Sequence, residues 1–489
     1  MRLGKPKTGV RRQKSGVRIL TFGFEGMIRD VLKKIVIFVI LFVFGIMINS
    51  VIPAQTWASS KSDKKQVTAP SDEASEQPGP WYKNIDDEWG GHVKIRGSVS
   101  WPDDESYFKY VGTDPCYDGS TELRIKNKLF LGSWGDFVTH YEAVFSGGDT
   151  WRREKSLEQL YPGLFEGALR AGGPPDGSRR LMDLTDTIDE DDTYIFYHRL
   201  DRLYMTVMPE WGVVRVGRQA VTWGNGLLFN PMDLFNPFSP SDIEREYKIG
   251  DDMVFTQVSM DSLGNLQVLF VPRRETVSGD VEWDQSSLAG KLHVAQSTTE
   301  FDIMAAKHYK DTVVGIGSTG YLGDTAWRLD GVWTFLDNKG DSDDYLSLVA
   351  NIDYSWVWWG KNFYGYVEYY FNGLCHNRYT ESYADRNISD RVERGELYTL
   401  GRNYLSGHVR VELHPLFNVY LTVINNVEDP SGAFQSRATW DITQNVQITM
   451  GGTMYYGGRD TEYGGYKITG TNFFTVPSDS AFLWLAYYY

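Results

Sequence analysis

The chain has 489 residues, 15% aromatic side chains, 49 Gly and a net charge of −15. This richness in Tyr, Trp and Gly is unusual for a soluble enzyme and typical of antiparallel β structure with aromatics at an interface. The acidic balance argues against nucleic acid as a partner. Cys116 and Cys375 form no zinc, CxxC or haem-attachment motif. They are either incidental thiols or a disulfide between two loops in an oxidising compartment.

The first 58 residues predict a secretory signal peptide. Residues 1–34 are basic, residues 35–48 form an apolar core, and Thr56 and Ala58 occupy the −3 and −1 positions of a cleavage site. An uncleaved membrane anchor is the alternative, but the apolar run is short for a spanning helix. Removing this segment, of net charge +8, from a chain of net charge −15 leaves −23. The polar, Pro- and Ser-rich residues 59–90 predict a flexible periplasmic segment.

Residues 91–489 predict a transmembrane antiparallel β-barrel, an all-β fold. Runs such as TELRIKNKLFLG (121–132) alternate apolar and polar side chains, which gives each strand one apolar and one polar face. We expect about 18 such strands (16–18), joined alternately by short periplasmic turns and by long extracellular loops. A secreted β-sandwich would also alternate, but it would not divide its links into a short set and a long set.

The lipid-facing positions and the chain end also fit a barrel. In the strand predicted over 345–358, alternate residues are apolar and the tryptophans fall beside a short turn, as in an interfacial girdle. The last residues, SDSAFLWLAYYY, resemble the C-terminal assembly signal of Gram-negative outer-membrane barrels. We therefore expect the barrel-assembly machinery to recognise Tyr489, and the chain to lie among the lipids and lipopolysaccharide of the outer membrane. A homo-oligomer is left open.

A stripe of basic side chains is predicted on one wall of the lumen. The last strand of a closed barrel pairs with the first, so the sixteenth strand lies near the first two. Charged side chains can face a water-filled pore but not hydrocarbon. They would either guide anionic solutes or stiffen the wall through ion pairs. The basic stripe consists of Lys94, Arg96, Arg124, Lys126, Lys128 and Arg437.

Residues 224–251 predict a loop that enters the pore or covers its outer mouth. Two Asn-Pro pairs exclude a helix and a central strand, yet the loop is rich in Phe, Leu and Met. Irregular backbone at membrane depth is tolerated only inside protein or against a water-filled cavity. As the third long loop, it is expected to constrict the lumen, with an apolar cap as the alternative. The residues expected at the constriction are Asn230, Asp233, Phe235, Asn236 and Asp242.

The strand predicted over 211–223 is expected to anchor this loop. Alternation places Arg215 and Arg218 on opposite faces. Either a β-bulge turns Arg218 inward, or this residue lies above the membrane edge. We predict that a bulge brings both arginines beneath the loop, where either one holds Asp233.

The residues around this loop carry a resemblance. The sequence resembles a Gly-Arg-Gln-x-Val-x-Trp-Gly … Asn-Pro-x-Asp signature of uncharacterised Gram-negative outer-membrane barrels of porin type. It is more distantly similar to alginate-export-type porins, which share a Gly-Arg-Gln strand. The resemblance supports the barrel class and implies no defined substrate. The matching residues are Gly217, Arg218, Gln219, Trp223, Gly224, Asn230, Pro231 and Asp233.

These features predict a passive channel for small hydrophilic solutes, including anionic ones. The eight His are scattered and none stands beside a recognisable Ser or Asp motif, so we expect no enzyme activity, no cofactor and no metal. Two alternatives remain. A sheath barrel of an electron-conduit complex would lack an inward third loop. A polysaccharide export barrel would carry a continuous Arg/Lys lane with acidic counter-charges.

Overall fold

The computed structural model describes residues 85–160, 172–240, 247–260, 264–340, 342–376, 379–467 and 474–489. All of them belong to one compact unit, Pro78–Tyr489. The predicted signal peptide, residues 59–84 and Asp242 lie outside the described residues. The first strand begins at Ile85, so six residues of the predicted flexible segment belong to it.

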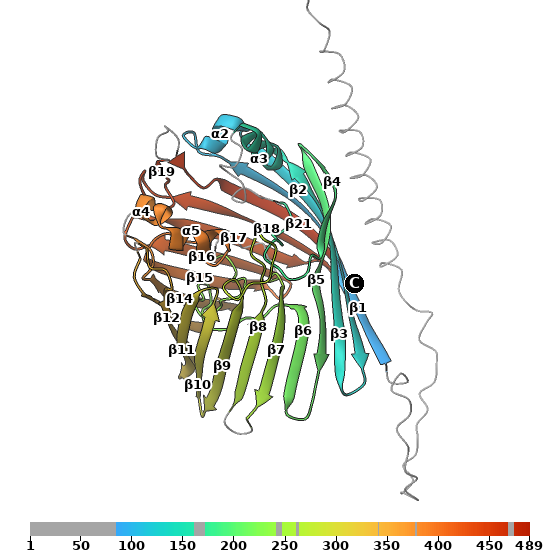
Figure 1. The fold of residues 1–489 in the computed structure, drawn as a ribbon. Helices are drawn as coiled ribbons and strands as arrows, with labels where there is room; N and C mark the ends of the chain where they lie inside the picture. The colour runs from blue at the N-terminus through green and yellow to red at the C-terminus, as the bar shows by residue number, and fades with distance from the viewer. Residues whose placement is uncertain are drawn as a thin grey trace, which may run out of the picture. The chain divides into compact units, whose positions relative to one another are not determined.

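Eighteen strands close into an antiparallel ring, as predicted (Figure 1). β21 completes the ring by pairing with both β18 and β1. One further strand, β4 (Thr185–Asp191), pairs only with β5. The ring strands are β1 (Ile85–Trp101), β2 (Cys116–Leu131), β3 (Gly135–Gly148), β5 (Tyr194–Val207), β6 (Gly212–Gln219), β7 (Asp251–Ser259), β8 (Asn265–Val271), β9 (Ser287–Gln296), β10 (Thr299–His308), β11 (Asp311–Leu322), β12 (Thr325–Phe335), β13 (Tyr345–Trp358), β14 (Lys361–Asn372), β15 (Asn403–His414), β16 (Phe417–Asn426), β17 (Ser431–Asp441), β18 (Val446–Tyr456) and β21 (Asp479–Tyr488).

The two rims of the ring differ in the length of their links. On one rim every link is a turn of a few residues, as between β13 and β14. The other rim carries the long links and the short elements within them, which lie together at one end in Figure 1. Among the described residues no helix is long and apolar enough to cross a membrane. The elements of the long-loop rim are α2 (Tyr107–Val111), α3 (Asp149–Leu160), α4 (Tyr379–Ala384), α5 (Arg386–Glu393), β19 (Tyr466–Lys467) and β20 (Phe474–Thr475).

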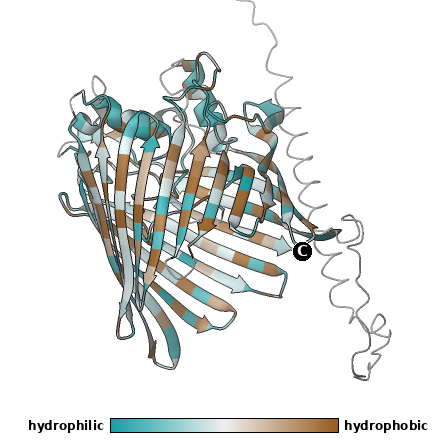
Figure 2. Ribbon diagram, turned by 60° about the horizontal axis from the view of Figure 1, so that its bottom comes forward, coloured by the Kyte–Doolittle hydropathy of each residue, from teal (hydrophilic) through white to brown (hydrophobic). Residues whose placement is uncertain are grey.

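The strands have an apolar outer face and a more polar inner face. On β14 the outward Val367 is 50% exposed, whereas its inward neighbour Glu368 is 1% exposed. Alternating apolar and polar bands run along the strands in Figure 2. At the short-turn rim, Trp356 stacks on Phe363 with ring centroids 5.3 Å apart. The predicted alternation and aromatic girdle are therefore present.

The buried residues are concentrated inside the ring. Inward side chains of β7 to β12 form one apolar cluster with residues of the β6–β7 link, and inward side chains of β13 to β16 form a second one with the same link. Cys116 and Cys375 are both buried and free, so they do not form the disulfide considered above. The core of this barrel is thus built around one of its own loops.

Candidate functional site

Between β6 and β7, residues 220–240 and 247–250 lie inside the barrel; we call these described residues the inserted loop. Glu368 of β14 holds its main chain through three backbone amides: Leu227 N–H and Phe229 N–H donate at 2.7 Å and Leu228 N–H at 3.1 Å. On β12, Asp330 accepts at 2.7 Å from the side-chain amide of Asn225 and at 2.6 Å from its backbone N–H. Buried amides need such partners, so two inward carboxylates fix the loop in the lumen.

Apolar contacts secure the same loop along its length. Trp223, Met232 and Phe235 are buried against inward residues of β7 to β12. Further round the ring, Phe229 stacks on Tyr370 of β14 with ring centroids 4.5 Å apart. Burial of four large apolar side chains stabilises the docked loop by several kcal/mol, at about 1.5–3 kcal/mol each. The loop therefore enters the barrel, as predicted, rather than covering its mouth.

The residues of the Gly-Arg-Gln signature turn the chain from the wall into the lumen. Trp223 Nε1 donates to Gln267 of β8 at 2.7 Å. Gly224 has φ +87°, and a Cβ there would lie 2.1 Å from Asn230 Oδ1. Asn230 in turn donates from Nδ2 to the Trp223 carbonyl at 2.8 Å. These contacts close a compact turn that requires glycine at position 224.

The structure corrects the predicted partner of Asp233. This carboxylate pairs with Lys248, on the returning arm of the same loop, and not with Arg215 or Arg218. Burial raises the pKa of Asp233 to about 6, although Lys248 opposes the shift. The loop is therefore closed by its own ion pair, which leaves Asp233 buried rather than facing a solute freely.

The predicted bulge is also absent. β6 keeps its register with β5 and β7 through Arg218, which has the outward phase of Val216. Arg218 is nevertheless 2% exposed, because it pairs with Asp252 (Nε to Oδ1, 2.8 Å) beneath the segment around Met182. Arg215 faces inward, 3.4 Å from Gln219 Oε1. Arg218 thus holds the segment around Met182 at the long-loop rim. β6 ends at Gln219, four residues before the predicted end at residue 223.

The remaining predicted constriction residues have structural roles in the inserted loop. Phe235 is buried and meets Trp223 edge-on at 5.9 Å. Asn236 has φ +51°, a left-handed conformation that Asn tolerates better than most residues, and it donates to the Ile249 carbonyl at 3.4 Å. Both residues shape the loop from within.

All six residues of the basic stripe have the inward phase of their strands. The inserted loop meets this wall at Tyr247, whose ring lies 4.5 Å from both Arg124 and Lys126. Lys126 Nζ also donates to the Tyr247 hydroxyl at 3.0 Å. The loop thus reaches across the lumen from the β8–β16 wall to the stripe.

Carboxylates neutralise part of the stripe. Arg124 pairs with the buried Asp201 and lies 3.8 Å from Glu142. Lys128 lies 3.6 Å from Asp136. Arg96 lies over an aromatic ring, 6.0 Å from the centroid of Phe482, and Arg437 lies 4.5 Å from that of Tyr420. Both proposed roles of the stripe, ion-pair stiffening and a cationic wall, therefore have residues that fit them.

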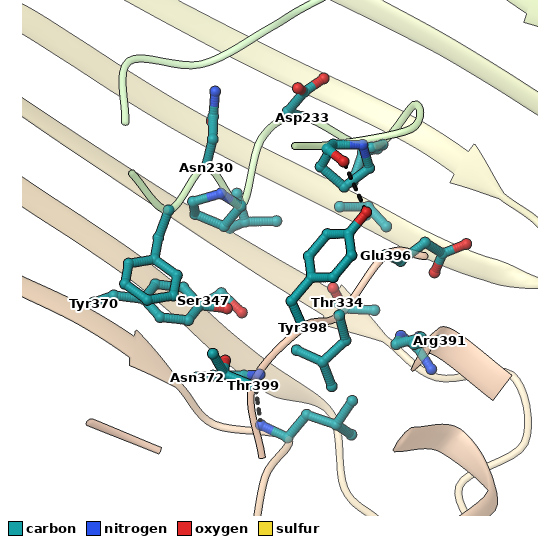
Figure 3. Close-up of a pocket in the computed structure, with 18 of the residues that line it drawn as sticks. Asn230, Asp233, Thr334, Ser347, Tyr370, Asn372, Arg391, Glu396, Tyr398 and Thr399 are labelled. Carbon is teal, nitrogen blue, oxygen red and sulfur yellow. Dashed lines mark hydrogen bonds between the residues drawn. The ribbon is translucent and has the colours of Figure 1, made fainter. Parts of the chain in front are cut away.

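A cavity of about 110 Å³ lies between the inserted loop and the wall of β10 to β14, at the long-loop end (Figure 3). The segment after α5 closes it from outside: Tyr398 donates from its hydroxyl to the Pro237 carbonyl at 2.9 Å. Beside it, Glu396 accepts from Arg394 Nε at 2.7 Å and lies 3.2 Å from His308 Nε2. Burial alone would raise the pKa of Glu396, but Arg394 and His308 hold it well below its ordinary value.

Sequence reasoning missed the residues that fix the loop. The sequence-based predictions give Glu368, Asp330 and Lys248 no role in holding the loop. The available signal was an isolated acidic residue at an inward position of an otherwise apolar strand end, as in YVEYY (366–370). Among the described residues, no group of three or more His, Cys, Asp or Glu is placed to hold a metal ion.

Comparisons with known proteins give likeness in fold only. No family model matches the chain, and no curated protein matches it. Solved structures that resemble it include OccAB3 of Acinetobacter baumannii (9% identity, TM-score 0.46, 83% of this chain and 99% of that chain). A BenF-like porin of Pseudomonas fluorescens Pf-5 has 11% identity and a TM-score of 0.45, and the match covers 82% of this chain and 98% of that chain. A third is Wzi of Escherichia coli, an outer-membrane protein involved in capsule assembly and described as a carbohydrate-binding β-barrel. It has 12% identity and a TM-score of 0.47, and the match covers 82% of this chain and 84% of that chain.

Proposed function

We propose that this protein is an outer-membrane, porin-like channel for passive diffusion of small hydrophilic solutes, with a preference for anions. The observation that carries the proposal is the inserted loop, fixed inside a closed barrel by Glu368 and Asp330 and reaching the basic stripe at Tyr247. A loop held in this way narrows a lumen. A wall in which Arg96 and Arg437 face the interior favours anions over cations.

Ion conduction tests this function directly. Purified protein in planar bilayers is expected to give discrete conductance steps, with a reversal potential in a KCl gradient that indicates preference for chloride. Deletion of residues 228–238 is expected to enlarge the steps, because it removes part of the inserted loop from the lumen and leaves a wider path for ions. Absence of conductance from both proteins would contradict the channel. An unchanged step size would contradict the constriction.

A polysaccharide export barrel is the second candidate. It is favoured by the lane of basic residues with acidic counter-charges, in which Arg124 is paired with Asp201 and Lys128 lies near Asp136. The inserted loop argues against the third candidate, a sheath around a partner protein, because the loop fills space that the partner would need. An exporter would be blocked by long anionic polysaccharide added from one side. A diffusion channel would give the same ion current with and without it.

A further inference from the structure

The cavity of Figure 3 continues toward the outer mouth. An adjoining cleft of about 310 Å³ shares Pro240, Tyr398 and Thr399 with it and is lined by Tyr455, Tyr463 and Tyr466 among others. Tyr398, 41% exposed, stands between the two spaces. The inner space is somewhat smaller than the ~150 Å³ cavity that holds a benzene ring, and the cleft has the size of an ordinary ligand pocket. A hexose ring is larger than benzene, so it would lie mainly in the cleft and reach the inner space with one edge.

Charged groups around the inner cavity are paired with one another. Glu396 is held by Arg394 and His308, Asp311 pairs with Arg391, and Asp233 pairs with Lys248. An ionic ligand would lose its hydration without gaining a free counter-charge, whereas an uncharged one would lose little. This end of the lumen therefore selects against charge, in contrast to the basic stripe across the ring.

Two buried threonines line the inner cavity. They are Thr334 of β12 and Thr399 of the segment after α5, and each is 5% exposed (Figure 3). Neither hydroxyl forms a hydrogen bond within the described residues. Buried polar groups are normally satisfied, so such a pair marks a place where a ligand with hydroxyl groups would be held.

We propose that the cavity and its adjoining cleft bind an uncharged saccharide on its way through the channel. The hydroxyls of a sugar ring match Thr334 and Thr399, and its apolar C–H face packs on an aromatic ring such as that of Tyr398. The charges around the inner cavity are paired, and the carboxylate of Glu462, which lines the cleft, already accepts hydrogen bonds from Leu400 N–H, the Tyr404 hydroxyl and Asn426 Nδ2. This lining fits a neutral sugar better than an acidic one. This inference rests on the proposed channel function and adds a neutral solute class to the anions that the basic stripe would favour.

The test compares three sugars that share a ring and differ in charge: glucose, glucuronate and glucosamine. Binding to the full-length protein in detergent is measured by titration calorimetry, and block of the ion current is measured in planar bilayers. Glucose is expected to bind more tightly than either charged sugar. Replacing both hydroxyls (T334V with T399V) is expected to weaken glucose binding about tenfold, which is about 1.4 kcal/mol, as expected for two neutral hydrogen bonds.

Two further variants complete the design. T453V alters another buried, inward threonine, on β18 and outside the cavity, and is expected to leave binding unchanged. Y398A removes the exposed ring and is expected to weaken binding even if the double threonine variant fails to fold. Glucose binding that is absent, unaffected by these cavity variants, or no tighter than that of a charged sugar would overturn the proposal. Loss of conductance alone would overturn the channel function, because calorimetry reads binding independently.

Discussion

Replacement of Glu368 by Gln should release the inserted loop while leaving the barrel intact. The carboxylate accepts four hydrogen bonds: three from the backbone amides of residues 227–229 and one from Asn351 Nδ2 at 3.0 Å. Glutamine keeps one oxygen, and its NH₂ group would face amide donors in place of the other. About two of the four bonds are therefore lost.

The expected size of the effect follows from the type of bond. Hydrogen bonds to a buried charged group contribute about 1.5–3 kcal/mol each, so two of them amount to about 3–6 kcal/mol of loop docking. Every 1.4 kcal/mol is tenfold, so the fraction of undocked loop rises by roughly 10²–10⁴. Strand pairing does not involve this side chain, so the strands are expected to stay paired when the loop is released.

Single-channel recording and limited chymotrypsin digestion measure loop release in the same preparation. E368Q is expected to show larger or fluctuating conductance and new cleavage within residues 220–250. The matched control is E412Q, which alters an inward carboxylate of β15 with no contact to the inserted loop among the described residues. If E368Q and E412Q both behave like the wild type, the carboxylate does not hold the loop and the reasoning is refuted.

Three further outcomes are expected. R218M should destabilise the barrel by about 3–5 kcal/mol, because it leaves Asp252 buried and unpaired, and adding D252L should restore most of this loss in heat-shift gels. R96M with R437M should lower the chloride-to-potassium permeability ratio derived from reversal potentials. The pKa of Glu396 is lower in the folded than in the unfolded state, so its stabilisation is full above about pH 4.3 and lost as the pH falls through the folded pKa. The protection factors of amides beside Glu396, which correct for the slower intrinsic exchange at low pH, should therefore fall on acidification, and E396Q should remove that change.

The strands and the insertion of the loop followed from local sequence. Period-two alternation and the lengths of the links predicted about 18 strands (16–18), and eighteen strands close the ring. Two Asn-Pro pairs among apolar side chains predicted that residues 224–251 are irregular chain that must be protected from lipid, and the structure places the described residues of this loop inside the ring. These properties depend on neighbours a few residues apart, which is why the sequence displays them.

The partners within the lumen did not follow from sequence. Asp233 had two nearby arginines as candidates, yet its partner is Lys248, because the returning arm of the loop folds back over the first. Glu368 binds an amide 139 residues away. Arg218 was expected beneath the loop, but an outer-rim segment more than thirty residues earlier covers it. Each of these contacts depends on the path of a long loop, and periodicity carries no information about that path.

The hydrogen bonds by which Glu368 holds the inserted loop have a consequence for how this protein can diversify. The carboxylate holds backbone amides, which every residue except proline supplies, and it does not depend on the side chains that residues 227 and 228 carry. The partly exposed Leu227 is thus free to change in character without releasing the loop. A barrel built in this way can acquire a new lining by ordinary point substitutions while its strands and the position of the inserted loop stay the same.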